Sequence, residues 1–346
     1  MKERLVGKTL DELQAICRNL DMPSFTAKQL TEWLYKKKAV SLNQMSNISL
    51  SHREKLKEKY DLGRQTPAKQ QKSTDGTIKY LFPVNDGKFI ETVFIPDEDR
   101  ATLCVSSQVG CKMDCLFCMT GKQRFTAQLT ASEIINQILS VPESDQLTNL
   151  VFMGMGEPLD NTDELFKVLE ILTASYGFAW SPKRITVSTI GLLPSLKRFL
   201  ESSQCHLAVS LHSPFHEERM SWMPVERRYP LTELIQLLSN YDFAHQRRLS
   251  FEYICFEGIN DDLIHAKALI KILSGLPCRV NLIKYHKIPG IDLPSSSMEN
   301  MIRFRDYLSK HGIICTVRSS RGEDILAACG MLSTKESGMN RDSREA

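Results

Sequence analysis

A chain of 346 residues with 42% apolar and 25% charged side chains lies in the ordinary range of globular proteins, which excludes extensive disorder. The N-terminus has no apolar core of a signal peptide, and no later segment approaches about 20 uninterrupted apolar residues, so we expect a cytoplasmic chain without membrane contact. The net charge of +3 is unevenly spread, because residues 1–72 carry 15 Lys and Arg against 8 Asp and Glu.

Residues 1–75 are predicted to form a small, basic helical domain. Thr9 and Glu12 have the spacing of a capping box, and apolar residues then recur at helical intervals. A second cap pattern, Thr-Ala-Lys-Gln at 26–29, predicts a helix that ends near the three lysines at 36–38. The excess of positive charge is typical of a module that binds nucleic-acid phosphates. Charge alone fits solvated helix faces equally well.

Residues 76–96 are predicted to form a β-hairpin adaptor. Two runs rich in β-branched and aromatic residues, Ile-Lys-Tyr-Leu-Phe-Pro and Lys-Phe-Ile-Glu-Thr-Val-Phe-Ile-Pro, flank Asn-Asp-Gly at 85–87. Such a turn between two strand patterns is a strong hairpin signal.

Residues 97–324 are predicted to form an α/β barrel, because short apolar strands alternate with helical patterns. The predicted strands are 102–106, 149–153, 184–188, 206–211, 249–254, 279–283 and 314–318. Repeated strand–helix units imply a parallel sheet, and six or seven of them favour a full or partial barrel over a flat sheet. Chemistry then gathers in the loops at the carboxyl ends of the strands. Residues 325–346 form a separate C-terminal segment.

Ten cysteines in a cytoplasmic chain of this length are expected to be thiols, metal ligands or catalytic groups. Cys111, Cys115 and Cys118 crowd into eight residues just after the first barrel strand. A structural zinc site closes with four ligands, and we find no fourth at suitable spacing. A 4Fe-4S cluster held by three thiolates instead leaves one iron open, so the spacing favours a cluster over zinc. The isolated cysteines are interpreted as buried small hydrophobes: Cys17, Cys205, Cys255, Cys278 and Cys315.

The pattern CxxxCxxC after the first barrel strand resembles the signature of radical S-adenosylmethionine (SAM) enzymes. The resemblance implies a partial (βα)6 TIM-like barrel and one 4Fe-4S cluster on the three cysteines. It also implies that SAM binds the open iron and is cleaved there to a 5′-deoxyadenosyl radical. SAM contacts are then expected from three strand ends, although each serine alone is more typical of a helix N-cap. The expected contacts are Gly156, Glu157, Ser188, Ser210, Leu211 and His212.

Four segments carry a closer resemblance, which covers nearly the whole chain. They are Thr-Leu-Cys-Val-Ser-Ser-Gln-Val-Gly-Cys from 102, Phe-Met-Gly-Met-Gly-Glu-Pro from 152, Ser-Leu-His-Ser-Pro from 210, and Asp-Ile-Leu-Ala-Ala-Cys-Gly from 324. These segments resemble the RlmN/Cfr family of radical SAM RNA methyltransferases.

The family resemblance implies roles for three further residues. Cys329 is expected to take a methyl group from a first SAM, and the radical from a second SAM then converts it to a methylene radical that adds to an adenine carbon. Glu91 is expected to accept the proton of that carbon. Cys104 is expected to release the product by attacking the sulfur of Cys329, in a transient disulfide that external reduction must reopen. Without the resemblance, Cys104 would be interpreted as a buried strand thiol and Glu91 as an edge residue.

Two positions depart from the family pattern. His286 stands where the family usually has Asn, and the resemblance implies that it contacts SAM from this position. Met331 stands two residues after Cys329, where Gln is usual, and we see no physical reason for this change to remove activity.

The expected function is methylation of carbon 2 of an adenosine in 23S rRNA at the peptidyl-transferase centre, and of the adenosine beside the anticodon in tRNA. The expected partners are these RNAs and an electron donor such as flavodoxin or ferredoxin, and the protein is expected to be a monomer. Two alternatives stay open. One is a Cfr-type enzyme that methylates carbon 8 and gives antibiotic resistance, and the other is a non-enzymatic, metal-stabilised RNA-binding protein.

Overall fold

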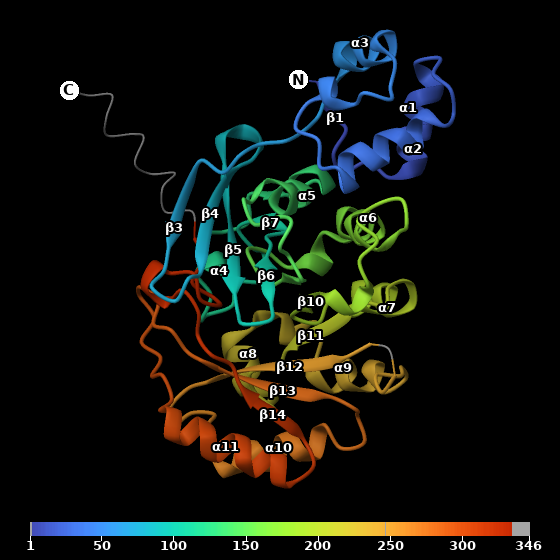
Figure 1. Cartoon of the computed structure of the whole chain (residues 1–346). Coiled ribbons are helices and arrows are strands. Elements are labelled where there is room, and N and C mark those ends of the chain that lie inside the picture. The colour runs from blue at the N-terminus through green and yellow to red at the C-terminus, as the bar shows by residue number, and fades with distance from the viewer. Residues whose placement is uncertain (1, 246, 334–346) are drawn as a thin grey trace, which may run out of the picture.

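The N-terminal part of the chain is a small helical unit at one end of the molecule. The computed structural model describes residues 2–245 and 247–333, so residues 334–346 of the predicted C-terminal segment lie outside the described residues. The unit contains α1 (Leu10–Asn19), α2 (Thr26–Thr31), a π-helical turn (Glu32–Lys36) and α3 (Leu50–Lys59). A short parallel pair, β1 (Glu3–Arg4) and β2 (Tyr60–Asp61), closes it. Figure 1 shows these helices at the opposite end from α10 and α11.

The first predicted helix cap is confirmed and the second is wrong. The Thr9 hydroxyl accepts from the backbone N–H of Glu12 at 3.3 Å, and the Glu12 carboxylate accepts from the backbone N–H of Thr9 at 2.8 Å. In contrast, α2 has Phe25 at its N-cap position and no side-chain capping bond. Thr26 lies inside this helix with 1% of its surface exposed, so its side chain packs in the interior instead of capping.

The central sheet is an open barrel with seven parallel strands. They are β6 (Ala101–Cys104), β9 (Asn149–Phe152), β10 (Ile185–Thr189), β11 (His206–Ser210), β12 (Leu249–Cys255), β13 (Arg279–Lys284) and β14 (Ile314–Val317), and they pair in chain order. Each matches a predicted strand. Because β6 and β14 do not pair within the described residues, the barrel stays open and the fold is the expected partial TIM-like barrel.

Six helices connect consecutive parallel strands, as a right-handed βαβ arrangement requires. They are α5 (Ala131–Ser140), α6 (Thr162–Thr173), α7 (Leu193–Ser202), α9 (Leu231–Leu238), α10 (Leu263–Ile272) and α11 (Met298–Lys310). Shorter elements lie in two of these connections. Between β6 and α5 the chain forms β7 (Gln108–Val109), α4 (Met119–Lys122) and β8 (Ala127–Gln128), and between β11 and α9 it forms α8 (His216–Trp222). None of the described helices combines the length and the apolar composition that crossing a membrane requires.

The predicted hairpin extends the barrel sheet. Strands β4 (Ile78–Pro83) and β5 (Phe89–Pro96) pair antiparallel around the Asn85–Gly87 turn, and β5 continues antiparallel along β6. A further edge strand, β3 (Lys69–Lys72), pairs with β4. The sequence did not indicate β3, because its four residues are all polar and exposed.

Helix α5 joins the helical unit and the hairpin to the barrel. All residues from Ala131 to Leu139 are buried, including three polar ones that hydrogen-bond to the surrounding elements. Asn136 accepts from the backbone N–H of Gln65 at 2.9 Å, and Gln137 accepts from the Thr92 hydroxyl at 2.7 Å. These bonds satisfy the buried amides and fix the orientation of the N-terminal part.

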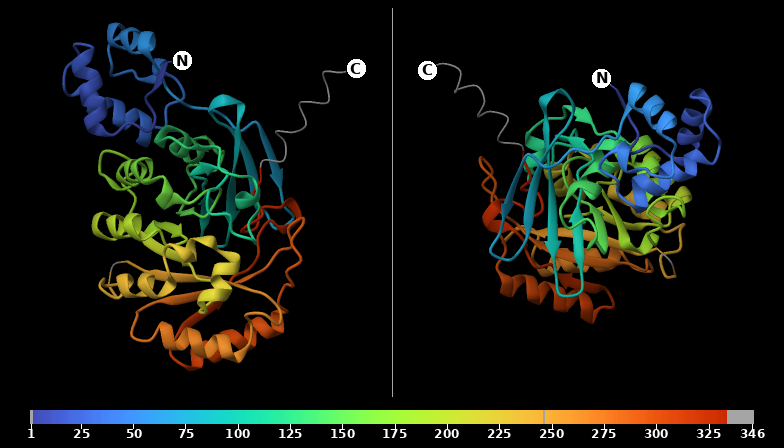
Figure 2. Two further views of the ribbon diagram at one scale, coloured as in Figure 1. Left: turned by 180° about the vertical axis from the view of Figure 1, so that it is seen from behind. Right: turned by 45° about the horizontal axis from the view of Figure 1, so that its top comes forward.

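The last described segment returns over the carboxyl ends of the strands toward the hairpin. Figure 2 shows this segment beside the hairpin strands in both views. The Asp324 carboxylate accepts from the Ser73 hydroxyl at 2.5 Å, and the backbone N–H of Gly322 donates to Asp75 at 2.9 Å. The chain after β14 is therefore held across the open side of the barrel.

Candidate active site

A cavity of about 160 Å³ opens at the carboxyl ends of the parallel strands. It is lined by nine of the residues that the sequence singled out: Cys111, Cys115, Cys118, Gly156, Glu157, Ser188, Ser210, His212 and Cys329. These residues come from the ends of β9, β10 and β11, from the cysteine loop and from the C-terminal segment. Such convergence at one mouth is where barrel enzymes place their chemistry.

The cysteine loop places three thiols at one rim of the cavity. Burial raises the pKa of all three thiols, and the mutual repulsion of their charges raises it further for Cys115. Among the described residues, no three His, Cys, Asp or Glu side chains are grouped to hold one metal ion. Three adjacent thiols on one rim fit an iron–sulfur cluster, whose positive iron would relieve their repulsion.

The cysteine loop is held by backbone contacts on both sides. The N–H of Leu116 donates to the carbonyl of Trp222 at 2.9 Å, and the N–H of Met119 donates to Gly330 at 2.8 Å. Gly121 lies so close to the Cys115 backbone that an added Cβ would stand 3.1 Å from its nitrogen. The position of the thiols therefore depends on α8 and on the C-terminal segment.

Gly156 and Glu157 form the turn after β9. Gly156 has φ +100°, and a Cβ there would lie 2.5 Å from the Cβ of Gln108, so packing alone requires glycine. Glu157 is buried, and its carboxylate accepts from the Thr189 hydroxyl at 2.7 Å and from the N–H of Ile190 at 2.9 Å. Burial raises the pKa of this carboxyl to about 7, while these hydrogen bonds oppose the shift.

The β11 end contributes a neutral histidine. His212 has φ +58°, and its Nδ1 accepts from the N–H of Ile254 at 3.1 Å, so the proton of the neutral ring is on Nε2. Burial and the nearby Arg219 lower the pKa of His212 to about 3. Leu211 is fully buried and does not line the cavity, and its backbone N–H and carbonyl bond to Glu252 and Arg219.

Arg219 is a buried residue that sequence reasoning missed. Its guanidinium donates to the carbonyls of Ser210 and Ile190, both at 3.1 Å, and forms an ion pair with Glu226. The pair fixes the carboxyl ends of β10 and β11 beneath the cavity. An arginine before an ordinary helix pattern gives no signal of this role in the sequence.

Cys329 lines the cavity and Cys104 does not, but the two thiols are close enough for their charges to interact. Neither is disulfide-bonded: Cys104 is buried at the end of β6, and Cys329 is exposed. The pKa of Cys104 is raised to about 12, chiefly by burial and also by the charge of Cys329, whereas Arg318 opposes the shift.

Arg318, also missed from the sequence, is held beside these two thiols. It follows β14, and its guanidinium forms an ion pair with Glu252 at 3.2 Å. The pair sits in the cavity wall, which places a fixed positive charge near both sulfurs.

Glu91 and His286 lie outside this cavity. The Glu91 carboxylate pairs with Lys79 at 3.0 Å, accepts from the N–H of Ser333 at 2.8 Å, and lines a separate hollow of about 490 Å³ beside β3 and β4. His286 is buried after β13, where its ring contacts the Ser320 hydroxyl at 2.9 Å and the Glu323 carboxylate at 3.2 Å. Both residues border the C-terminal segment that carries Cys329.

Part of the basic surface of the N-terminal unit has structural contacts. Lys38 donates to Ser144 and pairs with Asp145 at 2.6 Å, so it anchors the unit to the loop after α5. Lys37 pairs with Glu32 at 2.9 Å and lies over the Trp33 ring. On α3, Arg53 and Lys55 donate to the backbone carbonyls of Asn43 and Leu20. Lys57 pairs with Glu54, and Lys59 is exposed.

Comparisons with known proteins agree with this architecture. Residues 105–269 match the Radical SAM superfamily, and residues 4–62 match the ribosomal RNA large subunit methyltransferase N-terminal domain. The chain is 62% identical over 333 residues to a probable dual-specificity RNA methyltransferase RlmN of Bacteroides fragilis, which covers 96% of this chain and 97% of that protein.

A more distant relative and a solved structure lead to the same group. The dual-specificity RNA methyltransferase RlmN of Geobacter sulfurreducens is 42% identical and covers 95% of this chain and 91% of its own length. The crystal structure of a radical SAM methyltransferase from Sphaerobacter thermophilus superposes with a TM-score of 0.90 at 40% identity, over 95% of this chain and 99% of that one.

Proposed function

Because the chain belongs to the RlmN family of radical SAM RNA methyltransferases, we propose that it methylates carbon 2 of adenosine in two RNAs. The substrates would be 23S rRNA at the peptidyl-transferase centre and tRNA at the adenosine beside the anticodon, in the cytoplasm. The observation that carries the proposal is one cavity that gathers three cluster-type thiols with Cys329, next to a second thiol, Cys104. The non-enzymatic alternative does not fit a chain in a family of methyltransferases.

The cofactors in this proposal are one 4Fe-4S cluster and SAM, two molecules of which are used per methyl transfer. Cys111, Cys115 and Cys118 would hold the cluster, because they are adjacent thiols on one rim of the cavity. Reduced, such a cluster supplies the electron that makes a carbon radical from SAM.

The SAM site would lie between the cluster thiols and the strand ends. Gly156, Ser188 and Ser210 line that space, and Leu211 follows Ser210 in the chain. Glu157 would accept from the amino group of SAM through Oε2, which accepts only from the N–H of Ile190 and keeps a lone pair, whereas Oε1 already accepts from Thr189 and Leu159.

The two histidines would act differently in SAM binding. His212 offers an Nε2 proton donor that stays neutral at physiological pH, because the pKa of the ring is lowered to about 3. His286 would act through the C-terminal segment, because its ring contacts Ser320 and Glu323.

Methyl transfer would use Cys329 as the carrier and Cys104 as the resolving thiol. Cys329 is exposed and lines the cavity, which suits a sulfur that must meet both SAM and RNA. Cys104 is buried, so its thiol must lose a proton before it can attack the sulfur of Cys329 in the RNA adduct. Arg318 opposes the rise of the Cys104 pKa and so favours this thiolate.

Glu91 would accept the proton of the adenine carbon. Its carboxylate is held by Lys79 and by the N–H of Ser333, four residues after Cys329 in the chain. A base extruded toward Cys329 would therefore approach the same segment that fixes Glu91. A movement of that segment is needed to bring the carboxylate to the base, because the two lie in separate hollows here.

The basic N-terminal unit would bind RNA phosphates while the barrel mouth receives the unstacked base. The protein would act as a monomer and draw electrons from a flavodoxin or ferredoxin. Nucleoside mass spectrometry of rRNA and tRNA from cells with and without the gene tests the proposal. We expect 2-methyladenosine in both RNAs only when the gene is present. A product of 8-methyladenosine would instead establish the Cfr-type reaction.

A further inference from the structure

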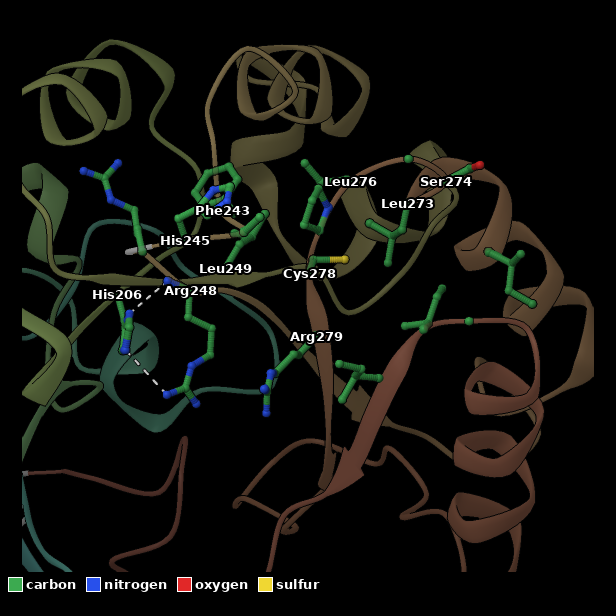
Figure 3. A pocket seen from close by; sticks show the side chains of 18 of the residues that line it. His206, Phe243, His245, Arg248, Leu249, Leu273, Ser274, Leu276, Cys278 and Arg279 are labelled. Carbon is green, nitrogen blue, oxygen red and sulfur yellow. Dashed lines mark hydrogen bonds between the residues drawn. The ribbon is translucent and has the colours of Figure 1, made fainter.

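A second cavity, of about 710 Å³, lies at the opposite end of the barrel from the cysteine loop. It is lined by the first residues of β11, β12, β13 and β14, whereas the thiol-lined cavity takes the last residues of the strands. Its volume falls in the range of small-molecule and cofactor sites. Figure 3 shows several of its side chains around one hollow.

The charged lining of this cavity is entirely basic. Lys183, Arg247, Arg248 and Arg279 line it, and no Asp or Glu of the described residues does. Ion pairs are common elsewhere in the described chain, yet none includes any of these four cations. Four cations without a carboxylate partner concentrate positive potential in one concave site.

His206 and Arg248 direct two proton donors at the same point. The backbone N–H of Arg248 donates to His206 Nδ1 at 2.9 Å, so the neutral ring carries its proton on Nε2. That nitrogen lies 3.5 Å from Nη2 of Arg248, which is also a donor, as Figure 3 shows. Two adjacent donors cannot satisfy each other, and an anionic oxygen between them would accept from both.

The neighbouring Arg247 leaves a buried donor unused. Its side chain is 5% exposed, and one guanidinium nitrogen donates to the carbonyl of Leu200 at 3.1 Å. Its Nε has no hydrogen-bond partner among the described residues. Arg247 is one of five buried side chains among the described residues that have such an unpartnered polar atom, and it is the one that lines this cavity.

The titration of His206 agrees with a strongly positive site. Burial lowers the pKa of the ring to about 4, and the charges of Arg248, Lys183 and Arg247 lower it in the same direction. The ring is therefore neutral at physiological pH and keeps the arrangement described above.

Part of the remaining lining is apolar, and His245, Ser274 and His311 add polar groups to it. Phe243, Leu276 and Ile314 contribute to the apolar part, and Ile314 has 54% of its surface exposed at the start of β14. Exposed apolar surface beside a cluster of cations suits a ligand that is flat and apolar at one end and anionic at the other.

We propose that this cavity is a nucleotide-binding site, in which Arg248, Arg279 and His206 hold a phosphate and the apolar lining receives the base. The site is separate from the methyl-transfer cavity and does not depend on it. The nucleotide comes either from a free nucleoside phosphate or from an exposed residue of an RNA strand, and the two sources share this chemistry.

The test is calorimetric titration of the cluster-loaded protein, with SAM in excess so that the thiol-lined cavity is occupied. The probes are guanosine 5′-monophosphate, guanosine, inorganic phosphate and a single-stranded RNA hexamer. The variant Arg248→Ala/Arg279→Ala removes two exposed cations of the site. The control Lys267→Ala/Arg303→Ala removes two exposed cations from α10 and α11 outside the cavity.

We expect the monophosphate or the hexamer to bind the parent protein. Its affinity for the site variant should be about tenfold or more weaker, because the variant lacks a few charge-assisted hydrogen bonds. The control should bind as the parent does. Binding of the monophosphate identifies a free nucleotide as the source, and binding of the hexamer alone identifies an RNA strand. The proposal is overturned if neither binds, if both variants behave alike, or if inorganic phosphate binds as tightly as the nucleotide.

Discussion

The backbone N–H of Met119 donates to the carbonyl of Gly330 at 2.8 Å, which ties the cysteine loop directly to the segment carrying Cys329. The next residue adds a second tie, since the Thr120 hydroxyl donates to the carbonyl of Leu332 at 2.9 Å in a buried position. The placement of the carrier sulfur relative to the three cluster thiols therefore depends on two neighbouring hydrogen bonds.

Replacing Thr120 by Val should loosen this connection. The change keeps the side-chain shape and leaves the Leu332 carbonyl without its donor, which costs about 1–2 kcal/mol. We expect faster hydrogen exchange in residues 326–333 and about tenfold slower methylation. In the control Thr173→Val, the lost hydroxyl donates to Leu169 within α6 at 2.8 Å. Equal exchange rates in the parent and in Thr120→Val would contradict the role of this contact.

Replacing Cys104 by Ala should trap a covalent enzyme–RNA adduct. Without the resolving thiol, the bond between Cys329 and the methylated base cannot be broken, so multiple turnover stops. Denaturing electrophoresis with labelled RNA should show the crosslinked species. Cys205→Ala removes a comparably buried thiol behind the barrel wall and should turn over normally. If Cys104→Ala releases methylated RNA like the parent, Cys104 is not the resolving residue.

Replacing Gly156 by Ala should destabilise the fold through two separate effects. Its φ of +100° strains any side chain, and the new Cβ would stand 2.5 Å from Gln108. Gly290 has a comparable φ of +79°, and an added Cβ there would meet nothing within 4 Å, so Gly290→Ala isolates the backbone strain. We expect the free energy of unfolding to fall by about 1–2 kcal/mol in Gly290→Ala and by about 2–4 kcal/mol in Gly156→Ala. Chemical denaturation of both variants measures the difference, and equal losses would contradict the packing argument.

The seven barrel strands could be predicted because each is a short apolar run bounded by polar residues, and burial on both faces of a parallel sheet requires such runs. The cysteine loop could be predicted because its three ligands are adjacent in sequence. Arg219 and Arg318 could not, since each acts on strand ends that are distant in the chain. The separation of Glu91 from the thiol-lined cavity also depends on tertiary structure, because the C-terminal segment lies between them.

The stability of the fold should depend on His206 between about pH 4 and pH 6.5. The pKa of this ring is lowered to about 4 in the folded chain, so the unfolded chain binds the proton more readily in this range. The full stability is therefore kept above pH 6.5, and the part of it that depends on a neutral His206 is lost as the pH falls toward 4. We expect His206→Asn, which cannot be charged, to reduce this loss by about 1 kcal/mol at pH 5 after allowance for solvent screening.

The matched control for this titration is His245→Asn. His245 is exposed and lines the same cavity. Denaturation curves at pH 5 and pH 7.5 give the comparison for each variant. The electrostatic interpretation of the cavity would be refuted if both variants reduced the loss of unfolding free energy between pH 7.5 and pH 5 by the same amount.

Arg318 should set the pH at which the resolving thiol works. Its guanidinium opposes the rise of the Cys104 pKa, so its removal leaves less thiolate at a given pH. We expect Arg318→Gln to accumulate the enzyme–RNA adduct and to shift the pH profile of product release toward alkaline values by about one unit. Arg318→Lys keeps the charge and should restore most of the profile. Arg321→Gln, which removes a cation paired with Asp97 three residues along the chain, serves as the control. A profile that moves equally in Arg318→Gln and Arg318→Lys would show that the shape of the guanidinium matters and its charge does not.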